Sequence, residues 1–254
     1  MKLHMHSYRY AKEILEHPTH RAALDEIEAA VKAMPLFLYP GKSAKKPKLD
    51  VVQQLLNTYF DRVLGRDRGW DYHPRATDIP DSKLAADFRK AFPGLVIQAE
   101  VQFGNMSRWY SDIFKFQTAY SQSLIDLALC VVPMASLAKR IDSNVAYYER
   151  VCRELPSAEL SITIPILVIG VEPDEGEVEI DVRRIGIPLK QLTGKGRRNL
   201  LKRKTHTELN RYRVVHSVLS GDDPYAVTDR SDHGPLPHAQ VEGADDDEDD
   251  DDDD

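Results

Sequence analysis

Cysteine is scarce in this sequence of 254 residues, and long apolar runs are missing. Cys130 and Cys152 lie in segments that we predict to be buried and have no Cys-x-x-Cys spacing, so two free thiols in a reducing compartment are expected. The longest apolar stretch, residues 160–171, is shorter than the ~20 residues that cross a bilayer. The first residues do not combine basic residues with a following apolar run, so we expect no signal peptide. We therefore expect a cytoplasmic protein with no membrane partner.

The net charge of −7 comes from one end of the chain. All ten residues of 245–254 are acidic, so the remaining residues carry a net charge of +3. Basic residues cluster at 194–213, with a smaller group at 41–48. Each cluster is either a solvated face or a surface that neutralises phosphates. The acidic end is either a disordered solvated tail or a mimic of phosphate that competes for a basic cleft.

Apolar patterning predicts strands that alternate with helices. This order is typical of an α/β domain with a central mixed β-sheet flanked by helices. From Gly221 onward Pro, Gly, Asp and His dominate. We expect one domain over 1–220 and a disordered acidic tail over 221–254. Strands are predicted at 95–103, 124–134, 161–171 and 177–185, the last at an edge, and helices at 8–17, 20–33, 50–64, 108–123, 135–140 and 145–155.

Two polar residues interrupt the predicted strand 95–103, where Glu100 and Gln102 share one face. The preceding residues, 83–94, have either a helical pattern or the pattern of a strand that forms a hairpin through Pro93-Gly94. In a hairpin centred on that turn, Asp87 lies directly opposite Glu100, with Cβ atoms ~4.5–5.5 Å apart. The hairpin therefore predicts a pair of facing carboxylates.

Two carboxylates at that separation repel each other unless a cation lies between them. Oxygen ligands favour a hard ion such as Mg²⁺, which keeps several waters and leaves positions for phosphate oxygens. Such an ion can polarise a phosphoryl oxygen and activate a water. This arrangement has the general shape of the PD-(D/E)xK nuclease site, although the spacing alone is a weak signal.

The stretch ADF…AEVQFGN (86–105) resembles the signature of type II restriction endonucleases of the BglII/BstYI group. In that group a DF pair precedes an EVQF strand, and Gln replaces the lysine of most relatives. Further similar segments occur in the same order over about residues 8–173. They are YAKEIL (10–15), DEIEAAV (25–31), MPL (34–36), Trp70, DLALCVVPMASLAKRI (126–141), AYYE (146–149) and IPILVIGVEP (164–173).

This resemblance implies a restriction-endonuclease-like fold and a Mg²⁺ site. Asp87 and Glu100 would be metal ligands, the Val101 carbonyl a third, and Gln102 would orient the attacking water. The gap between Asp87 and Glu100 is four residues longer than in the relatives, which adds two residues to each strand and keeps the acids opposed. Asp81, in a literal Pro-Asp pair, is the alternative first ligand. His73 is either a supporting polar group near the site or a surface loop residue.

The resemblance also implies a homodimer that cuts palindromic double-stranded DNA with a GATC core, together with a cognate DNA methyltransferase. Gly104 and Asn105 follow the catalytic strand, where the family faces DNA, and Asn suits adenine. Asn105 could instead be an ordinary turn residue, and Ser143 or Asn144 a helix cap. Further DNA-contact candidates are Asp142, Ser143 and Asn144 for bases, and Arg183, Arg184, Lys195, Arg197 and Arg198 for phosphates.

Two other functions are compatible with the sequence. One is a catalytically silent DNA-binding module on the same fold. The other is a nuclease of another defence or repair system that lacks strict sequence specificity.

Overall fold

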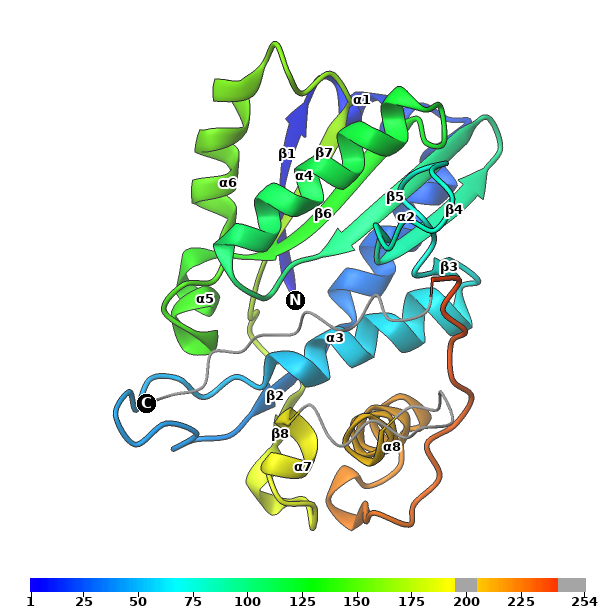
Figure 1. Cartoon of the computed structure of the whole chain (residues 1–254). Coiled ribbons are helices and arrows are strands. Elements are labelled where there is room, and N and C mark those ends of the chain that lie inside the picture. The colour runs from blue at the N-terminus through cyan, green and yellow to red at the C-terminus, as the bar shows by residue number, and fades with distance from the viewer. Residues whose placement is uncertain (195–204, 242–254) are drawn as a thin grey trace.

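A six-stranded mixed sheet forms the centre of the computed structural model, which describes residues 1–194 and 205–241 (Figure 1). The strand order is β1-β7-β6-β5-β4-β3. Strands β5, β6 and β7 run parallel, whereas β1, β4 and β3 pair antiparallel with their neighbours. The bounds are β1 (Lys2–Tyr8), β3 (Asp71–Tyr72), β4 (Phe88–Phe92), β5 (Leu95–Val101), β6 (Leu127–Pro133) and β7 (Ile166–Glu172).

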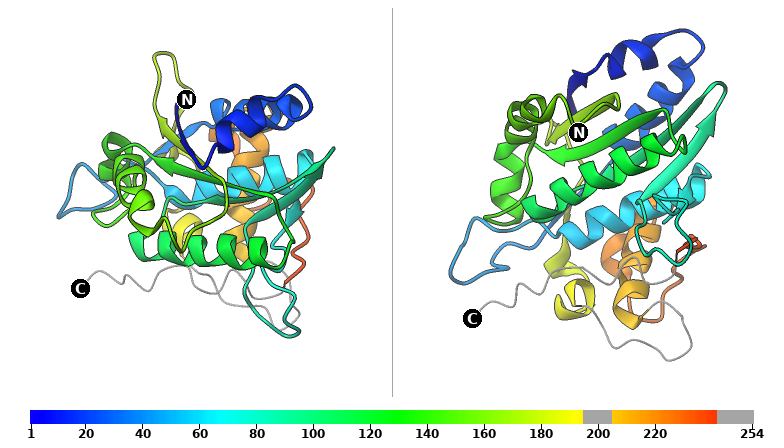
Figure 2. Two further views of the ribbon diagram at one scale, coloured as in Figure 1. Left: turned by 90° about the horizontal axis from the view of Figure 1, so that it is seen from above. Right: turned by 45° about the horizontal axis from the view of Figure 1, so that its top comes forward.

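Helices cover both faces of this sheet, as the two views in Figure 2 show. Every residue of β6 is buried, because alternate side chains enter two apolar clusters on opposite faces. One cluster contains Leu129 and the apolar sides of α1, α2, α3 and α5, and the other contains Cys130 and those of α4 and α6. The helices are α1 (Ala11–Glu16), α2 (Arg21–Lys32), α3 (Gln53–Arg62), α4 (Met106–Ser121), α5 (Ala135–Ile141) and α6 (Tyr148–Glu154). The predicted α/β fold with a mixed central sheet is thus confirmed.

A second group of elements packs against the other side of α3 (Figure 1). It consists of a small parallel sheet, β2 (Leu36–Leu38) with β8 (Glu179–Asp181), and the helices α7 (Lys190–Thr193) and α8 (His206–Ser220). Helix α8 begins with a capping box, in which Thr205 and Glu208 each accept a hydrogen bond from the other's backbone N–H. Short helical turns lie at Val63–Asp67, Leu155–Ala158, Val182–Arg184 and Pro224–Ala226.

Several features of this architecture differ from the sequence predictions. The structure contains strands β1, β2 and β3 and helices α7 and α8, which were not predicted. Strand β8 pairs with β2 instead of at an edge of the main sheet. The first part of the predicted disordered tail, 221–241, is also ordered. Val227 and Val241 are buried there, and the backbone N–H groups of Gln240 and Val241 donate to the carbonyls of Tyr72 and His73 at 2.9 Å. These apolar anchors and backbone bonds explain the order, whereas residues 242–254 lie outside the described part.

Cys130 and Cys152 are free thiols, as predicted. Within residues 1–194 and 205–241, no helix combines the length and the apolar character needed to cross a membrane.

Candidate active site

A β-hairpin brings the two predicted acids to one place. Strands β4 and β5 pair antiparallel from Phe92↔Leu95 to Phe88↔Ala99, which is the register predicted from the Pro93-Gly94 turn. Gly94 has a φ of 70°, a left-handed conformation that glycine adopts without the cost a side chain would add. Asp87 lies one residue beyond the last pair, so the register continues to Glu100. The alternative prediction, a helix over 83–94, is wrong.

Asp87 is tied to the backbone on both sides. Its Oδ2 accepts a hydrogen bond of 2.8 Å from the N–H of Val101, and its carbonyl accepts one of 3.0 Å from the N–H of His73. Asp81, the alternative first ligand, is exposed in a turn with a φ of 59° and does not line the cleft described below. The position of Asp87 therefore favours it over Asp81.

Glu100 is 1 % exposed, and its carboxylate contacts a cation. Nζ of Lys115 donates to Oε2 of Glu100 at 3.0 Å. Burial raises the pKa of Glu100 well above its ordinary value; the Lys115 ammonium opposes this shift, and the carboxylates of Asp87 and Asp112 add to it. Glu100 is therefore a buried carboxylate close to those of Asp87 and Asp112.

Gln102 uses both ends of its side-chain amide inside the protein. Its Nε2 donates to Oδ2 of Asp112 at 2.8 Å, and its Oε1 accepts from the N–H of Gly104 at 2.9 Å. Because Gln102 is also buried, its amide supports the site and holds Asp112 in place.

Asp112 and Lys115 of α4 were not predicted as site residues. Asp112 is buried on the same side of the helix as Trp109 and Phe116, and its Oδ1 accepts from Nζ of Lys115 at 3.1 Å. A carboxylate within this apolar stripe is the sequence signal that could have identified it. Burial raises the pKa of Asp112 to about 6, with Lys115 and Gln102 opposing and Asp87 adding. Burial disfavours the Lys115 charge, but Glu100, Asp112 and Asp87 outweigh that effect and raise the pKa of Lys115 above its ordinary value.

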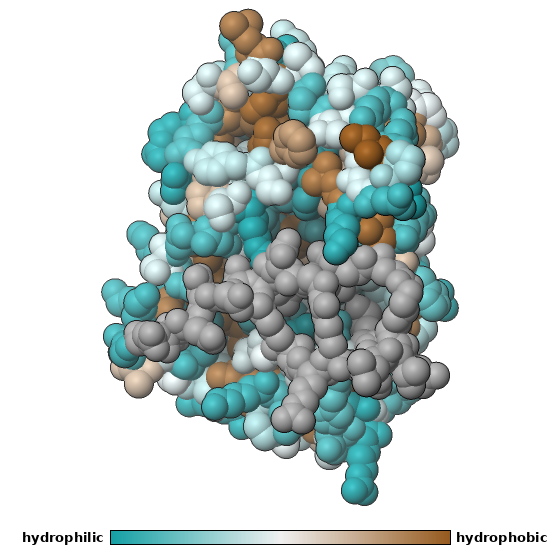
Figure 3. Space-filling model, in the orientation of Figure 1, coloured by the Kyte–Doolittle hydropathy of each residue, from teal (hydrophilic) through white to brown (hydrophobic). Residues whose placement is uncertain are grey.

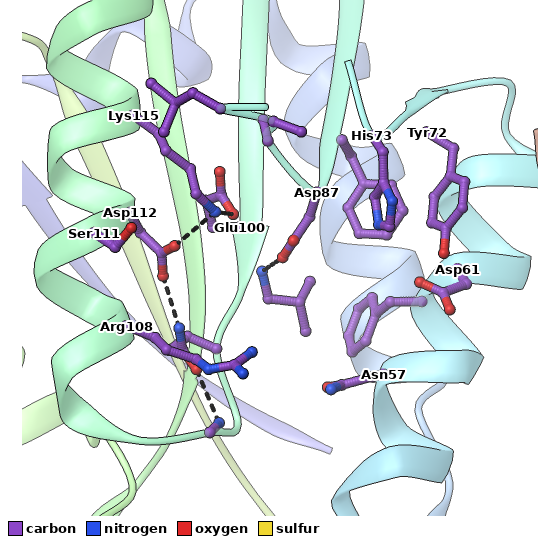
Figure 4. A pocket seen from close by; sticks show the side chains of 18 of the residues that line it. Asn57, Asp61, Tyr72, His73, Asp87, Glu100, Arg108, Ser111, Asp112 and Lys115 are labelled. Atoms are coloured by element: carbon purple, nitrogen blue, oxygen red, sulfur yellow. Dashed lines mark hydrogen bonds and ion pairs between the residues drawn. The ribbon is translucent and has the colours of Figure 1, made fainter. Parts of the chain in front are cut away.

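These side chains line a cleft between the sheet and α3 (Figure 4). Its volume is about 270 Å³. Gln53, Asn57 and Asp61, four residues apart on α3, form the wall opposite the acids. His73 also lines the cleft and is buried, so its position fits the first of its two interpretations, a polar group near the site, and not a surface loop residue.

The donor set fits a divalent cation. Asp87, Glu100 and Asp112 carry three negative charges when ionised and Lys115 one positive charge, so a cation of charge +2 would balance the cluster. Within the residues that the structure describes, no three His, Cys, Asp or Glu side chains are arranged to hold a metal by themselves. Mg²⁺ commonly binds through one or two carboxylates and several waters, so a pair of acids with a backbone carbonyl suits it.

Two sets of predicted DNA-contact residues meet beside this cleft. Asn105 caps α4, because its Oδ1 accepts from the N–H of Ser107 at 2.9 Å, and the same oxygen accepts from Nδ2 of Asn144 at 3.0 Å. Gly104 lines the cleft, and its carbonyl accepts from the N–H of Ala146. In the adjoining loop Asp142 accepts from the N–H and hydroxyl of Ser143, and Lys46 donates to the Ser143 hydroxyl at 3.3 Å. Tyr147, and neither Ser143 nor Asn144, occupies the N-cap of α6.

Two of the predicted phosphate contacts lie outside the cleft. Arg183 pairs with Asp181 at 2.8 Å, and the Arg184 guanidinium stacks over the Tyr225 ring at 3.8 Å from its centroid. Neither arginine lines the cleft. Lys195, Arg197 and Arg198 are outside the described residues.

Comparison with known proteins identifies the family and supports the fold. The family described as "Restriction endonuclease BglII/BglIII" matches residues 3–171. The crystal structure of restriction endonuclease BglII complexed with a DNA 16-mer is similar at a TM-score of 0.56 and 20 % identity, covering 68 % of this chain and 79 % of that one. The crystal structure of free BglII gives a TM-score of 0.48 and 21 % identity over 68 % and 81 % of the two chains. No curated protein matches. The family match spans about two thirds of the sequence, and the chain therefore belongs to the BglII/BglIII family of restriction endonucleases.

Proposed function

We propose that this type II restriction endonuclease hydrolyses double-stranded DNA at a palindromic site with a GATC core and depends on Mg²⁺. The hairpin register carries this proposal, because it brings Asp87 to the position opposite Glu100 and binds its carboxylate to the backbone of Val101. The combination of acids, backbone and open cleft favours an enzyme over a silent binding module, since burying three carboxylates together is costly unless they serve a bound cation.

In the proposed site Asp87, Glu100 and the Val101 carbonyl hold the cation. When bound, Mg²⁺ would polarise a phosphoryl oxygen and make water a better nucleophile. The protein's own contribution is positioning: the hairpin fixes the two acids, and α4 holds Asp112 and Lys115 against them. We assign Gln102 a supporting role through Asp112 instead of direct contact with the attacking water, because both ends of its amide are occupied.

Base recognition is assigned to the junction of Asn105 and Asn144. Oδ1 of Asn105 is occupied by Ser107 and Asn144, which leaves Nδ2 of Asn105 as a donor and Oδ1 of Asn144 as an acceptor within the described part. A donor beside an acceptor complements N7 and the N6 amino group of adenine in the major groove. Gly104, Asp142 and Ser143 shape this junction, and Arg183, Arg184, Lys195, Arg197 and Arg198 would contact phosphates, which position the DNA without specifying sequence.

The outer face of α4 supports a homodimer. Tyr110 and Phe114, one turn apart, are 52 % and 63 % exposed, and apolar surface gathers over the upper half of the face in Figure 3, where α4 lies. Paired subunits would present two equivalent clefts to the two halves of a palindrome. We also propose a cognate DNA methyltransferase that protects the same site in the host.

Digestion of DNA of known sequence, followed by mapping of the ends, tests the proposed function. We expect discrete fragments with Mg²⁺, none with a chelator, and ends at one palindromic sequence that contains GATC. A smear would favour a nuclease without strict specificity, and binding without cleavage under any divalent metal would favour the silent module. Methylation of the mapped site should abolish cleavage.

A further inference from the structure

The residue that follows the metal-binding strand cannot supply charge to the reaction. Gln102 is neutral, buried, and bonded at both ends of its amide to Asp112 and Gly104. Phosphodiester hydrolysis builds negative charge on the phosphoryl oxygens, and positively charged donors commonly stabilise it. Any positive charge that the protein adds to that of the cation must therefore come from another element.

Helix α4 presents such a charge at the acids. The Lys115 side chain is 17 % exposed, and its ammonium lies 3.0 Å from Glu100 and 3.1 Å from Asp112. Lys83 and Arg108 also line the cleft, and Lys115 is within ion-pair distance of both Glu100 and Asp112. Figure 4 shows Lys115 projecting from α4 toward Glu100.

Asp112 connects this lysine to the strand. It accepts from Gln102 on one oxygen and from Lys115 on the other, so a chain of contacts runs from Gly104 through Gln102, Asp112 and Lys115 to Glu100. An ammonium group has three N–H donors. Two of them reach Glu100 and Asp112, and the third has no acceptor within residues 1–194 and 205–241, so it is available to a group in the cleft.

We infer that Lys115 is a catalytic residue that donates to a non-bridging oxygen of the scissile phosphate, and that Asp112 is its positioning residue. The inference rests on the proposed function. In the reaction the oxygen of water bonds to phosphorus and one P–O ester bond breaks. The water loses a proton to solvent and the leaving oxygen takes one from solvent. Lys115 transfers no proton and acts through its charge and its hydrogen bond.

The test compares Lys115→Gln with the wild type and with Lys32→Gln. Lys32 also pairs with a glutamate, Glu28, at 2.5 Å, but lies on α2 away from the cleft. We would measure single-turnover cleavage in Mg²⁺, DNA affinity in Ca²⁺, thermal unfolding, and Mn²⁺ binding to the free protein by calorimetry. Lys115→Gln should fold, bind DNA within a few-fold of wild type, and cleave on the order of 10²-fold more slowly or worse. Lys32→Gln should cleave like wild type.

The Mn²⁺ measurement distinguishes a catalytic role of Lys115 from a role in which it only holds Glu100 in place. Removing a positive charge beside the acids should leave Mn²⁺ affinity unchanged or tighter, whereas a lysine that only holds the ligands in place would lose affinity and rate together. If Lys115→Gln does not fold, the charge-balanced double variant Asp112→Asn/Lys115→Met should fold and show the same loss of rate.

Cleavage by Lys115→Gln, or by the double variant where that is used, within threefold of wild type would overturn the inference and leave the proposed function intact. A rate loss matched by an equal loss of Mn²⁺ affinity would overturn it as well. A wild-type protein that cleaves no DNA would overturn the proposed function and this inference together.

Discussion

The carboxylate of Asp87 accepts a 2.8 Å hydrogen bond from the backbone N–H of Val101, beyond the last paired residues of the β4–β5 hairpin. This bond joins the two strands at the point where their ladder ends. It also fixes Asp87 beside the residue whose carbonyl we assign to the metal. The position of the first acid therefore depends on the hairpin register.

Gly94→Ala should weaken the hairpin. Its φ of 70° is disfavoured for alanine, whereas the added Cβ would meet His20 at an ordinary 3.6 Å, so strain is the main cost. We expect the free energy of unfolding to fall by about 1–2 kcal/mol, which corresponds to a fall in Tm of roughly 2–8 °C. Cleavage should be lost at temperatures well below Tm. Gly176→Ala, with a φ of 82° and open space around it, is the matched control. Equal effects of the two variants on cleavage would contradict the assigned role of the hairpin.

Asn105 has a structural and a proposed recognition role, and two substitutions separate them. Asn105→Ser keeps a good N-cap for α4 and should unfold near the wild-type temperature, whereas Asn105→Ala should lose about 0.5–2 kcal/mol of stability. Both lose the Nδ2 donor. The ratio of affinities for the mapped site and for a scrambled duplex, measured in Ca²⁺, should fall about tenfold or more in both. If the ratio of the two affinities is unchanged in Asn105→Ser, the role of Asn105 is limited to capping α4.

Deletion of residues 245–254 should tighten non-specific DNA binding at low salt. Gln240 and Val241 are bonded to Tyr72 and His73, so the described part ends beside the cleft that His73 lines. The ten acidic charges that follow in the sequence would compete with DNA if they reach the cleft, and salt would screen the effect over about 10 Å at 0.1 M. A chain with these ten residues replaced by serine should behave like the deletion. An unchanged affinity at low salt would remove the idea that the tail competes with DNA.

The sequence predicted what short-range patterns determine. The Pro93-Gly94 turn and the alternation of 95–101 specified the β4–β5 register, and the apolar runs marked β6 and β7 as buried. Strand β1 was not predicted because its apolar face is short: Leu3 and Met5 pack against the core, and two histidines occupy the other face. Lys115 and Asp112 were not predicted because their role depends on the contact between α4 and β5, and the local pattern offered only a carboxylate within the apolar stripe of α4. Helix α8 was not predicted because its sequence is polar, and its residues become buried only through packing against α3 and α7.

The central claim is that Asp87 and Glu100 form a metal-dependent catalytic pair, and the most direct test is single-turnover DNA cleavage in Mg²⁺ by Asp87→Asn, Glu100→Gln and Asp81→Asn. Asp81 is the matched control, since it is an exposed acid six residues away that does not line the cleft. Thermal unfolding would first establish that all three variants are folded. Asp87→Asn and Glu100→Gln should cleave on the order of 10³-fold more slowly or worse, because each removes a charge that holds the cation. Asp81→Asn should cleave at the wild-type rate. Retained cleavage in Asp87→Asn, or its loss in Asp81→Asn, would contradict the account.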